Sequence, residues 1–153
     1  DEVAVVRGRL GPDPLNADAD PGQFYRAAAK SSRPIGVILM DQAAISGVGN
    51  IFRAESLYRQ KIDPLRPGKT LSDDELRRLW DDNKHLLTIG VRVGRIITTE
   101  QQDRPGIPET EAWPDHANYV YMRHGQKCPR CSATIRMEEI AGRKLYWCPG
   151  CQK

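Results

Sequence analysis

Four cysteines near the C-terminal end constrain the fold of this chain most. They form two Cys-x-x-Cys pairs, Cys128/Cys131 and Cys148/Cys151, with 16 residues between the pairs. Two pairs about 15–20 residues apart are typical of zinc ribbons, in which a hairpin brings both turns together. Four thiolates then complete a tetrahedron and leave no position for water. The spacing therefore predicts one structural Zn²⁺.

Two other uses of these cysteines remain open at this point, a redox dithiol and free buried thiols. A secreted disulfide scaffold is disfavoured, because such chains spread their cysteines and carry an export signal, which this sequence does not show. Zinc with four thiolates carries a charge of −2. Three basic residues close to the cysteines would offset it: Lys127, Arg130 and Lys144.

The residues between the cysteine pairs have the pattern of a β-hairpin. Residues 134–140 and 144–148 form the expected strands, with a turn at Ala141–Gly142. This segment has too few apolar side chains to fold alone, so metal binding must supply much of its folding energy. Arg143 follows the turn and projects away from the metal. It is either an ordinary exposed charge or a contact to DNA.

The preceding residues predict helices. We expect a short helix at 21–31 with Asp20 as its N-cap, a buried core helix beginning at Pro34 with the sequence PIGVILMDQAA, and a third helix from Asn50 to about Gln60. Ser72 and Glu75 form a capping box that begins the clearest helix. The fold class expected is mainly α with a small β part.

The stretch ISGVGN, residues 45–50, separates two of these helices. Gly47 and Gly49 permit positive φ and remove bulk, so a phosphate could approach the amides of a helix N-terminus. Asn50 could cap that helix or turn its amide outward as a donor. The competing interpretation is a corner whose glycines serve packing only, and by itself the stretch slightly favours packing.

Three further segments carry weaker patterns. Residues 1–9 alternate like a strand and are expected to be the tail of a preceding β domain or a connector. Residues 98–118 are polar and contain proline, which predicts a loop that is mobile or becomes ordered on a partner. The sequence NYVYMRHG, residues 118–125, is expected to form a short aromatic strand.

Charge is distributed unevenly along the chain. Residues 113–153 carry 7 Lys+Arg and 3 Asp+Glu, whereas the net charge of the whole chain is only +3. Such a basic segment indicates an anionic partner or a solvated basic surface. No run of 18 apolar residues occurs, so no membrane span is expected.

Four ordered motifs together resemble the C-terminal half of the formamidopyrimidine-DNA glycosylase and endonuclease VIII family. They are LGPDPL (10–15), MDQAAISGVGNIFRAESLYRQKIDPLRP (40–67), YVYMRHGQKCPRC (119–131) and GRKLYWCPGCQK (142–153). The resemblance implies a helix-two-turn-helix domain over residues 10–112 and a zinc-finger hairpin over residues 113–153.

The resemblance also implies roles for single residues. Asn50 matches an asparagine that contacts the DNA backbone beside the lesion, and the clearance at Gly47 and Gly49 serves that contact. Arg143 matches an arginine at the zinc-finger tip that contacts phosphates flanking the flipped nucleotide. The expected partner is double-stranded DNA with a damaged base or an abasic site, bound by a monomer in a bacterial-type cytoplasm.

The resemblance departs from the family in two places. The family's nucleophile is an N-terminal proline followed by a glutamate, whereas this chain begins Asp1-Glu2-Val3, so no catalytic residue is assigned here. Some members specific for oxidised purines carry a lysine near the position of Gly36. Glycine there favours oxidised pyrimidines as the preferred lesion.

We therefore expect the DNA-binding portion of a base-excision-repair glycosylase and AP lyase, which removes oxidised bases and cleaves the strand by β,δ-elimination. This chain alone is expected to bind DNA without cutting it. The first alternative is a stand-alone, non-catalytic zinc-ribbon module that binds nucleic acid or protein. The second is an independent lyase that uses a lysine or another amine.

Overall fold

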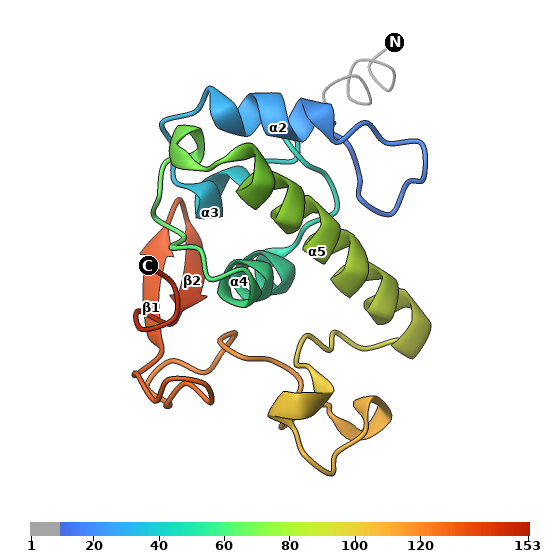
Figure 1. Cartoon of the computed structure of the whole chain (residues 1–153), viewed down its shortest axis with the longest axis vertical. Helices are drawn as coiled ribbons and strands as arrows, with labels where there is room; N and C mark the ends of the chain where they lie inside the picture. The colour runs from blue at the N-terminus through green and yellow to red at the C-terminus, as the bar shows by residue number, and fades with distance from the viewer. Residues whose placement is uncertain (1–9) are drawn as a thin grey trace.

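The computed structural model describes residues 10–153, so the strand expected at 1–9 lies outside the described residues. In the described part of the chain, four α-helices precede a two-stranded hairpin: α2 (Gly22–Ala29), α3 (Ile35–Ile38), α4 (Asn50–Arg59), α5 (Asp73–Val93), β1 (Arg136–Ile140) and β2 (Arg143–Trp147). Short 3-10 helices also lie at Gly68–Thr70, Gln101–Asp103 and Glu109–Glu111. The mainly α fold with a small β part is confirmed. Figure 1 shows α4 at the centre, between α5 and the hairpin.

Helix α5 begins and ends as its sequence predicts. The Ser72 side chain accepts a hydrogen bond from the Glu75 backbone, and the Glu75 carboxylate accepts one from the Ser72 N–H. Gly94 ends the helix in the left-handed conformation, with φ of 76°. Within residues 10–153, no helix combines the length and the apolar composition that a bilayer crossing requires.

The start of α2 differs by one residue from the prediction. Pro21 is the N-cap residue, and the Asp20 carboxylate accepts the N–H of Gly22 from one position further out. The carboxylate therefore still satisfies one of the free backbone donors at the start of the helix.

The buried helix expected from Pro34 is much shorter than its apolar sequence suggests. It ends after Ile38, and the side chain of Asp41 then accepts the N–H of Ala43 in a separate turn. The backbone N–H of Gly11 donates to the carbonyl of Gln42 at 2.7 Å. A Cβ on Gly11 would lie 2.6 Å from the Ala44 backbone, so the Gly11 segment packs directly on the turns that follow Ile38, where i→i−3 bonds such as Asp41 N–H to the Ile38 carbonyl replace the helical pattern.

Two apolar cores share helix α4. One lies among the helices and includes Leu57 of α4 with Phe24, Ile38, Leu76 and Trp80. The other joins α4 to the C-terminal segment and contains Ala54, Tyr58, Tyr119, Val120, Cys128, Ile135, Tyr146 and Cys148. Because both cores include residues of α4, the cysteine segment packs on the helical part and does not form a separate unit.

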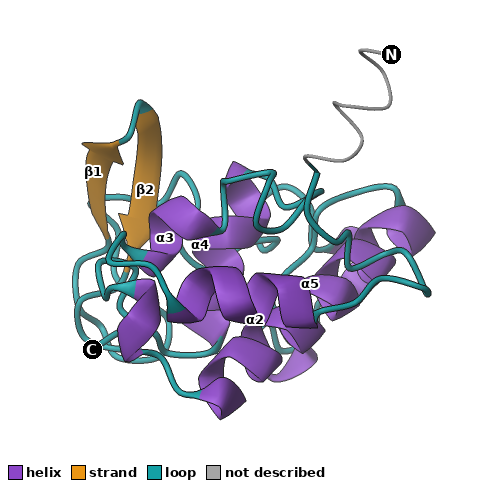
Figure 2. Ribbon diagram, turned by 90° about the horizontal axis from the view of Figure 1, so that it is seen from above, coloured by secondary structure: helices purple, strands orange, loops and turns teal. Residues whose placement is uncertain are grey.

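The expected hairpin is confirmed. Its strands are antiparallel, with Arg136 opposite Trp147 and Ile140 opposite Arg143. Ala141 and Gly142 form the turn, with φ of 52° and 77°. The turn projects beyond the helices (Figure 2).

The aromatic segment at 118–125 is not a strand. The N–H groups of Tyr119, Val120 and Tyr121 all donate to the carboxylate of Glu55, at 2.6, 2.8 and 3.0 Å. Successive amides of an extended strand point in opposite directions, so they could not share one acceptor. The buried Glu55 therefore folds this segment into a turn that faces α4.

The polar segment at 98–118 is packed within the chain, whereas a loop that is mobile or becomes ordered on a partner was expected. The N–H of Thr98 donates to the carbonyl of Ala117 at 2.8 Å, which closes the segment at its base. Ile97, Ala112 and Ala117 are buried in a small cluster of their own.

Candidate nucleic-acid interface and metal centre

The two cysteine turns meet at the end of the hairpin away from its loop. Cys128 and Cys131 lie in a turn closed by the Ser132 N–H to Cys128 carbonyl bond, and Cys148 directly follows β2. In the second turn, a Cβ at Gly150 would lie 2.6 Å from the sulfur of Cys131. Glycine at position 150 therefore allows the two turns to approach each other.

The four sulfur atoms fit a single zinc ion. All lie within 4.8 Å of one another, with Cys128 Sγ and Cys151 Sγ 3.7 Å apart and Cys131 Sγ and Cys148 Sγ 3.3 Å apart. A tetrahedron with Zn–S bonds of about 2.3 Å has edges of about 3.8 Å. The four cysteines are thus the ligands of one structural Zn²⁺, as their spacing predicts.

Protein donors support the negative charge on these sulfurs. The backbone N–H of Arg130 donates to Cys128 Sγ, and that of Cys151 donates to Cys148 Sγ, both at 3.4 Å. Burial acts to raise the pKa of the Cys128 thiol. Hydrogen bonds from Tyr58 and from backbone N–H groups outweigh that effect and lower its pKa to about 7.

The start of α4 has an open face. Gly47 has φ of 88° and needs glycine for that reason, whereas Gly49 has φ of −92° and ψ of −179°. The prediction of positive φ is therefore wrong for Gly49, which adopts extended backbone as the N-cap. A Cβ at Gly49 would meet nothing within 4 Å. The clearance predicted at Gly49 is present. At Gly47 the prediction is wrong, because a Cβ there would lie 3.1 Å from the Asp13 carboxylate and the backbone N–H already donates to Gln42 Oε1.

Asn50 is the first residue of α4 and does not cap it, so the capping prediction is wrong. Its side chain joins two parts of the chain that are distant in sequence. The Nδ2 group donates to the carbonyl of Lys144 on β2 at 2.9 Å, and Oδ1 accepts from the guanidinium of Arg53. The bond to Lys144 fixes the start of α4 against the hairpin.

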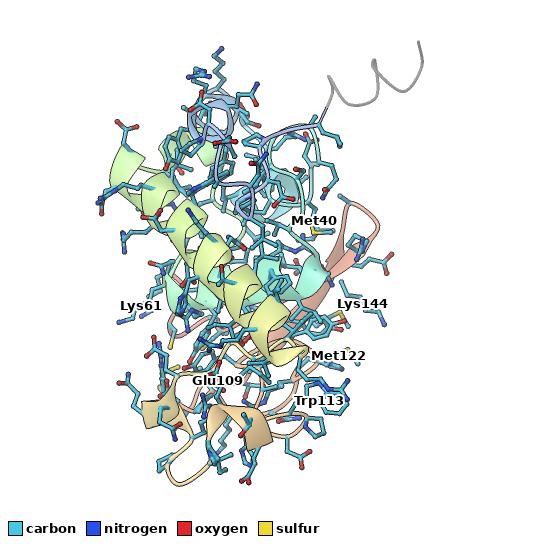
Figure 3. The ribbon with its side chains drawn as sticks, turned by 90° about the vertical axis from the view of Figure 1, so that its right-hand side faces the viewer. Met40, Lys61, Glu109, Trp113, Met122 and Lys144 are labelled. Carbon is cyan, nitrogen blue, oxygen red and sulfur yellow. The ribbon has the colours of Figure 1, made fainter. Side chains whose placement is uncertain are left out.

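Arg143 neighbours Lys144 on β2, so it lies beside the start of α4. Both side chains are exposed. Figure 3 shows Lys144 on the side of the molecule that carries the hairpin. Two residues 93 positions apart, Asn50 and Arg143, therefore reach the same surface, as a shared contact to DNA requires.

Arg53 was not predicted from the sequence as part of this site. It is only 1% exposed, yet within residues 10–153 no carboxylate forms an ion pair with it. Its guanidinium donates to the carbonyl of Gly36 at 2.7 Å and to Asn50 Oδ1, while Nε finds no partner in that part of the chain. Burial lowers its pKa to about 10, and the charge of Arg143 acts in the same direction.

Helical spacing could have indicated Arg53, because it lies four residues before the buried Leu57 on the same helix face. A positively charged side chain on that buried helix face needs buried hydrogen-bond acceptors. The exposed Arg143 lies close enough to the buried Arg53 for its charge to lower the pKa of Arg53. The free N–H groups at the start of α4 add a partial positive charge. Such a surface attracts anions.

The fold and the site define a helical domain joined through one central helix to a four-cysteine zinc hairpin. Family models match both parts: the formamidopyrimidine-DNA glycosylase H2TH domain at residues 10–102, and the zinc finger found in FPG and IleRS at residues 125–153. The chain therefore belongs to the formamidopyrimidine-DNA glycosylase family.

Individual relatives agree with this family. The chain is 45% identical over 152 residues to Endonuclease 8 1 of Mycobacterium tuberculosis, covering 99% of this chain and 56% of the relative. It is 39% identical over 150 residues to the formamidopyrimidine-DNA glycosylase of Thermus thermophilus, covering 94% and 54%. The chain thus spans a little over half the length of these relatives.

Solved structures show the same fold. Lactococcus lactis Fpg in complex with DNA containing an abasic site superposes with a TM-score of 0.79 at 27% identity, covering 99% of this chain and 55% of that one. The MutM (FPG) protein from Thermus thermophilus superposes with a TM-score of 0.78 at 34% identity, covering 99% and 56%.

Proposed function

We propose that this chain is the DNA-binding half of a base-excision-repair glycosylase and AP lyase that removes oxidised bases and cleaves the strand by β,δ-elimination. Its partner is double-stranded DNA with a damaged base or an abasic site, bound by a monomer in a bacterial cytoplasm. The hydrogen bond from Asn50 to the Lys144 carbonyl carries the proposal, because it places the start of α4 and Arg143 on one surface.

The chemistry of this surface suits a DNA backbone. Helix N-terminal N–H groups and arginines are common phosphate donors, and such contacts position the protein without reading sequence. Open space at Gly49 lets a phosphate approach these groups. Contacts from both the helix and the hairpin would offset the energy of bending the DNA and the few kcal/mol that flipping a nucleotide typically costs.

The test is a titration of abasic-site duplex with the wild-type chain and two variants. Asn50→Ala and Arg143→Ala should each weaken binding about tenfold, about 1.4 kcal/mol, with unchanged helix content by circular dichroism. Arg26→Ala removes an exposed guanidinium from α2 and is the matched control. If either site variant bound like this control, the role proposed for that residue would be wrong.

A second assay separates binding from chemistry. Borohydride traps the Schiff base that a lyase amine forms with an abasic site. The chain should bind the duplex and form no covalent adduct, whereas an adduct would support an independent lyase. The preference for oxidised pyrimidines suggested by Gly36 stays a prediction, and competition between duplexes carrying each lesion class would test it.

A further inference from the structure

Tyr58 contacts the zinc site from helix α4. Its side chain is fully buried, and its hydroxyl oxygen lies 3.1 Å from Cys128 Sγ. Among the described residues, no other side chain apart from the cysteines forms a hydrogen bond to any of the four sulfurs. The turn of Cys128 therefore receives one hydrogen-bond donor that the turn of Cys148 lacks, the Tyr58 hydroxyl.

Zinc binding determines the direction of this hydrogen bond. A sulfur that ligates zinc is a thiolate without a proton, so only the tyrosine hydroxyl can donate. A tyrosine hydroxyl carries a proton at neutral pH and can donate it. Cys128 then accepts from the Tyr58 hydroxyl as well as from the Arg130 N–H.

Neighbouring side chains hold the Tyr58 ring in place. It stacks on Tyr119 with ring centroids 4.6 Å apart and an interplanar angle of 24°. The Arg130 guanidinium lies over both rings, 4.7 Å from the centroid of Tyr119 and 5.5 Å from that of Tyr58. Asp103 fixes Arg130 through an ion pair at 2.8 Å and also accepts from the Tyr119 hydroxyl.

We propose that Tyr58 is a positioning residue of the zinc site, whose hydroxyl donates to the Cys128 thiolate and slows release of the metal. The donated bond draws negative charge from a site with a net charge of −2, and it orients the ligand for the ion. Removing outer-shell partners of metal ligands typically weakens metal affinity by about 10–100-fold. The inference rests on the metal centre and is independent of the DNA-binding proposal.

Tyr58→Phe tests the inference, because it removes the hydroxyl and keeps the stacked ring. Zinc release from the loaded chain to excess chromogenic chelator should be about tenfold faster or more, with unchanged helix content. Tyr119→Phe is the matched control. It lies in the same stack and loses its own hydroxyl bonds, but its hydroxyl does not contact a sulfur. Its release rate should stay near that of the wild type.

Cobalt substitution separates a bond to the thiolate from general loosening. Without the donated hydrogen bond, the thiolate gives up charge more easily, so the sulfur-to-cobalt charge-transfer band should move to lower energy in Tyr58→Phe and not in Tyr119→Phe. Equal release rates for Tyr58→Phe and the wild type would overturn the inference. Equal acceleration in both variants with an unmoved band would overturn it too.

Discussion

Arg53 orients the side chain of Asn50. The guanidinium holds Asn50 Oδ1, which leaves the amide NH₂ directed at the hairpin, and it also binds the Gly36 carbonyl behind the helix. A buried charge without an ionic partner is costly, and its removal would also leave the buried Gly36 carbonyl without its donor. We infer that Arg53 serves to orient Asn50.

Arg53→Met should therefore weaken DNA binding and also lower stability. Loss of the bond that orients Asn50 is expected to weaken binding of abasic-site duplex about threefold to tenfold, and the melting temperature should fall because the buried Gly36 carbonyl loses its donor. Both are measured on one preparation, by fluorescence anisotropy and by thermal denaturation.

A double variant gives the control. If Arg53 acts through Asn50, adding Arg53→Met to Asn50→Ala should cost little further affinity, because the two residues act as a unit. Wild-type affinity in Arg53→Met, or additive losses in the double variant, would show that Arg53 does not position Asn50.

The elements of this fold differ in how far their own sequence determines them. The local sequence determines helix α5 and the hairpin, since a capping box, a periodic apolar face and a two-residue turn are all formed by residues close in sequence. It does not determine the segments after Ile38 and at 118–125. Their form depends on Gly11 and Glu55, which are distant in sequence, so apolar and aromatic composition alone predicted them wrongly.

The same distinction applies to the site. Zinc ligation was predictable, because spacing within one hairpin brings the cysteines together. The roles of Arg53 and Tyr58 were not, since Arg53 acts through Asn50, whose partner Lys144 is distant in sequence, and Tyr58 contacts a cysteine 70 positions away. These hydrogen bonds form only in the assembled fold.

The start of α5 should show a specific pH dependence. Bonds from Arg66 lower the pKa of Glu75 from 4.5 to about 2, burial acts in the opposite direction, and the Ser72 N–H adds to the lowering. A depressed carboxyl pKa stabilises the fold above the unfolded value, and this contribution is lost as pH falls from about 4.5 towards 2.

Glu75→Gln should therefore destabilise the protein by about 1–2 kcal/mol at pH 6, after allowance for solvent screening. The difference from the wild type should narrow by pH 3, because the carboxyl of the unfolded chain is then protonated, whereas the folded carboxyl, with a pKa of about 2, is still largely ionised. Urea unfolding followed by circular dichroism measures it. Acid loss of zinc affects both chains alike, so a difference that stayed constant with pH would exclude this role for Glu75.

The whole molecule is organised around α4. Its first residue bonds the hairpin, its middle contributes Glu55 to the 119–121 turn, and Tyr58 reaches the zinc site. Zinc therefore stabilises more than the two cysteine turns, because the hairpin that it anchors carries Arg143 beside Asn50. The DNA binding that we propose depends on this arrangement.

Salt dependence of binding to abasic-site duplex tests these contacts to the DNA backbone most directly. Each neutralised phosphate contributes a slope of about −0.9 to the logarithm of affinity against the logarithm of salt concentration. If the chain neutralises two phosphates, affinity should fall about tenfold between about 50 and 200 mM salt. Arg143→Ala should make this slope shallower by about 1. An affinity unchanged across this range would contradict a role in gripping the DNA backbone.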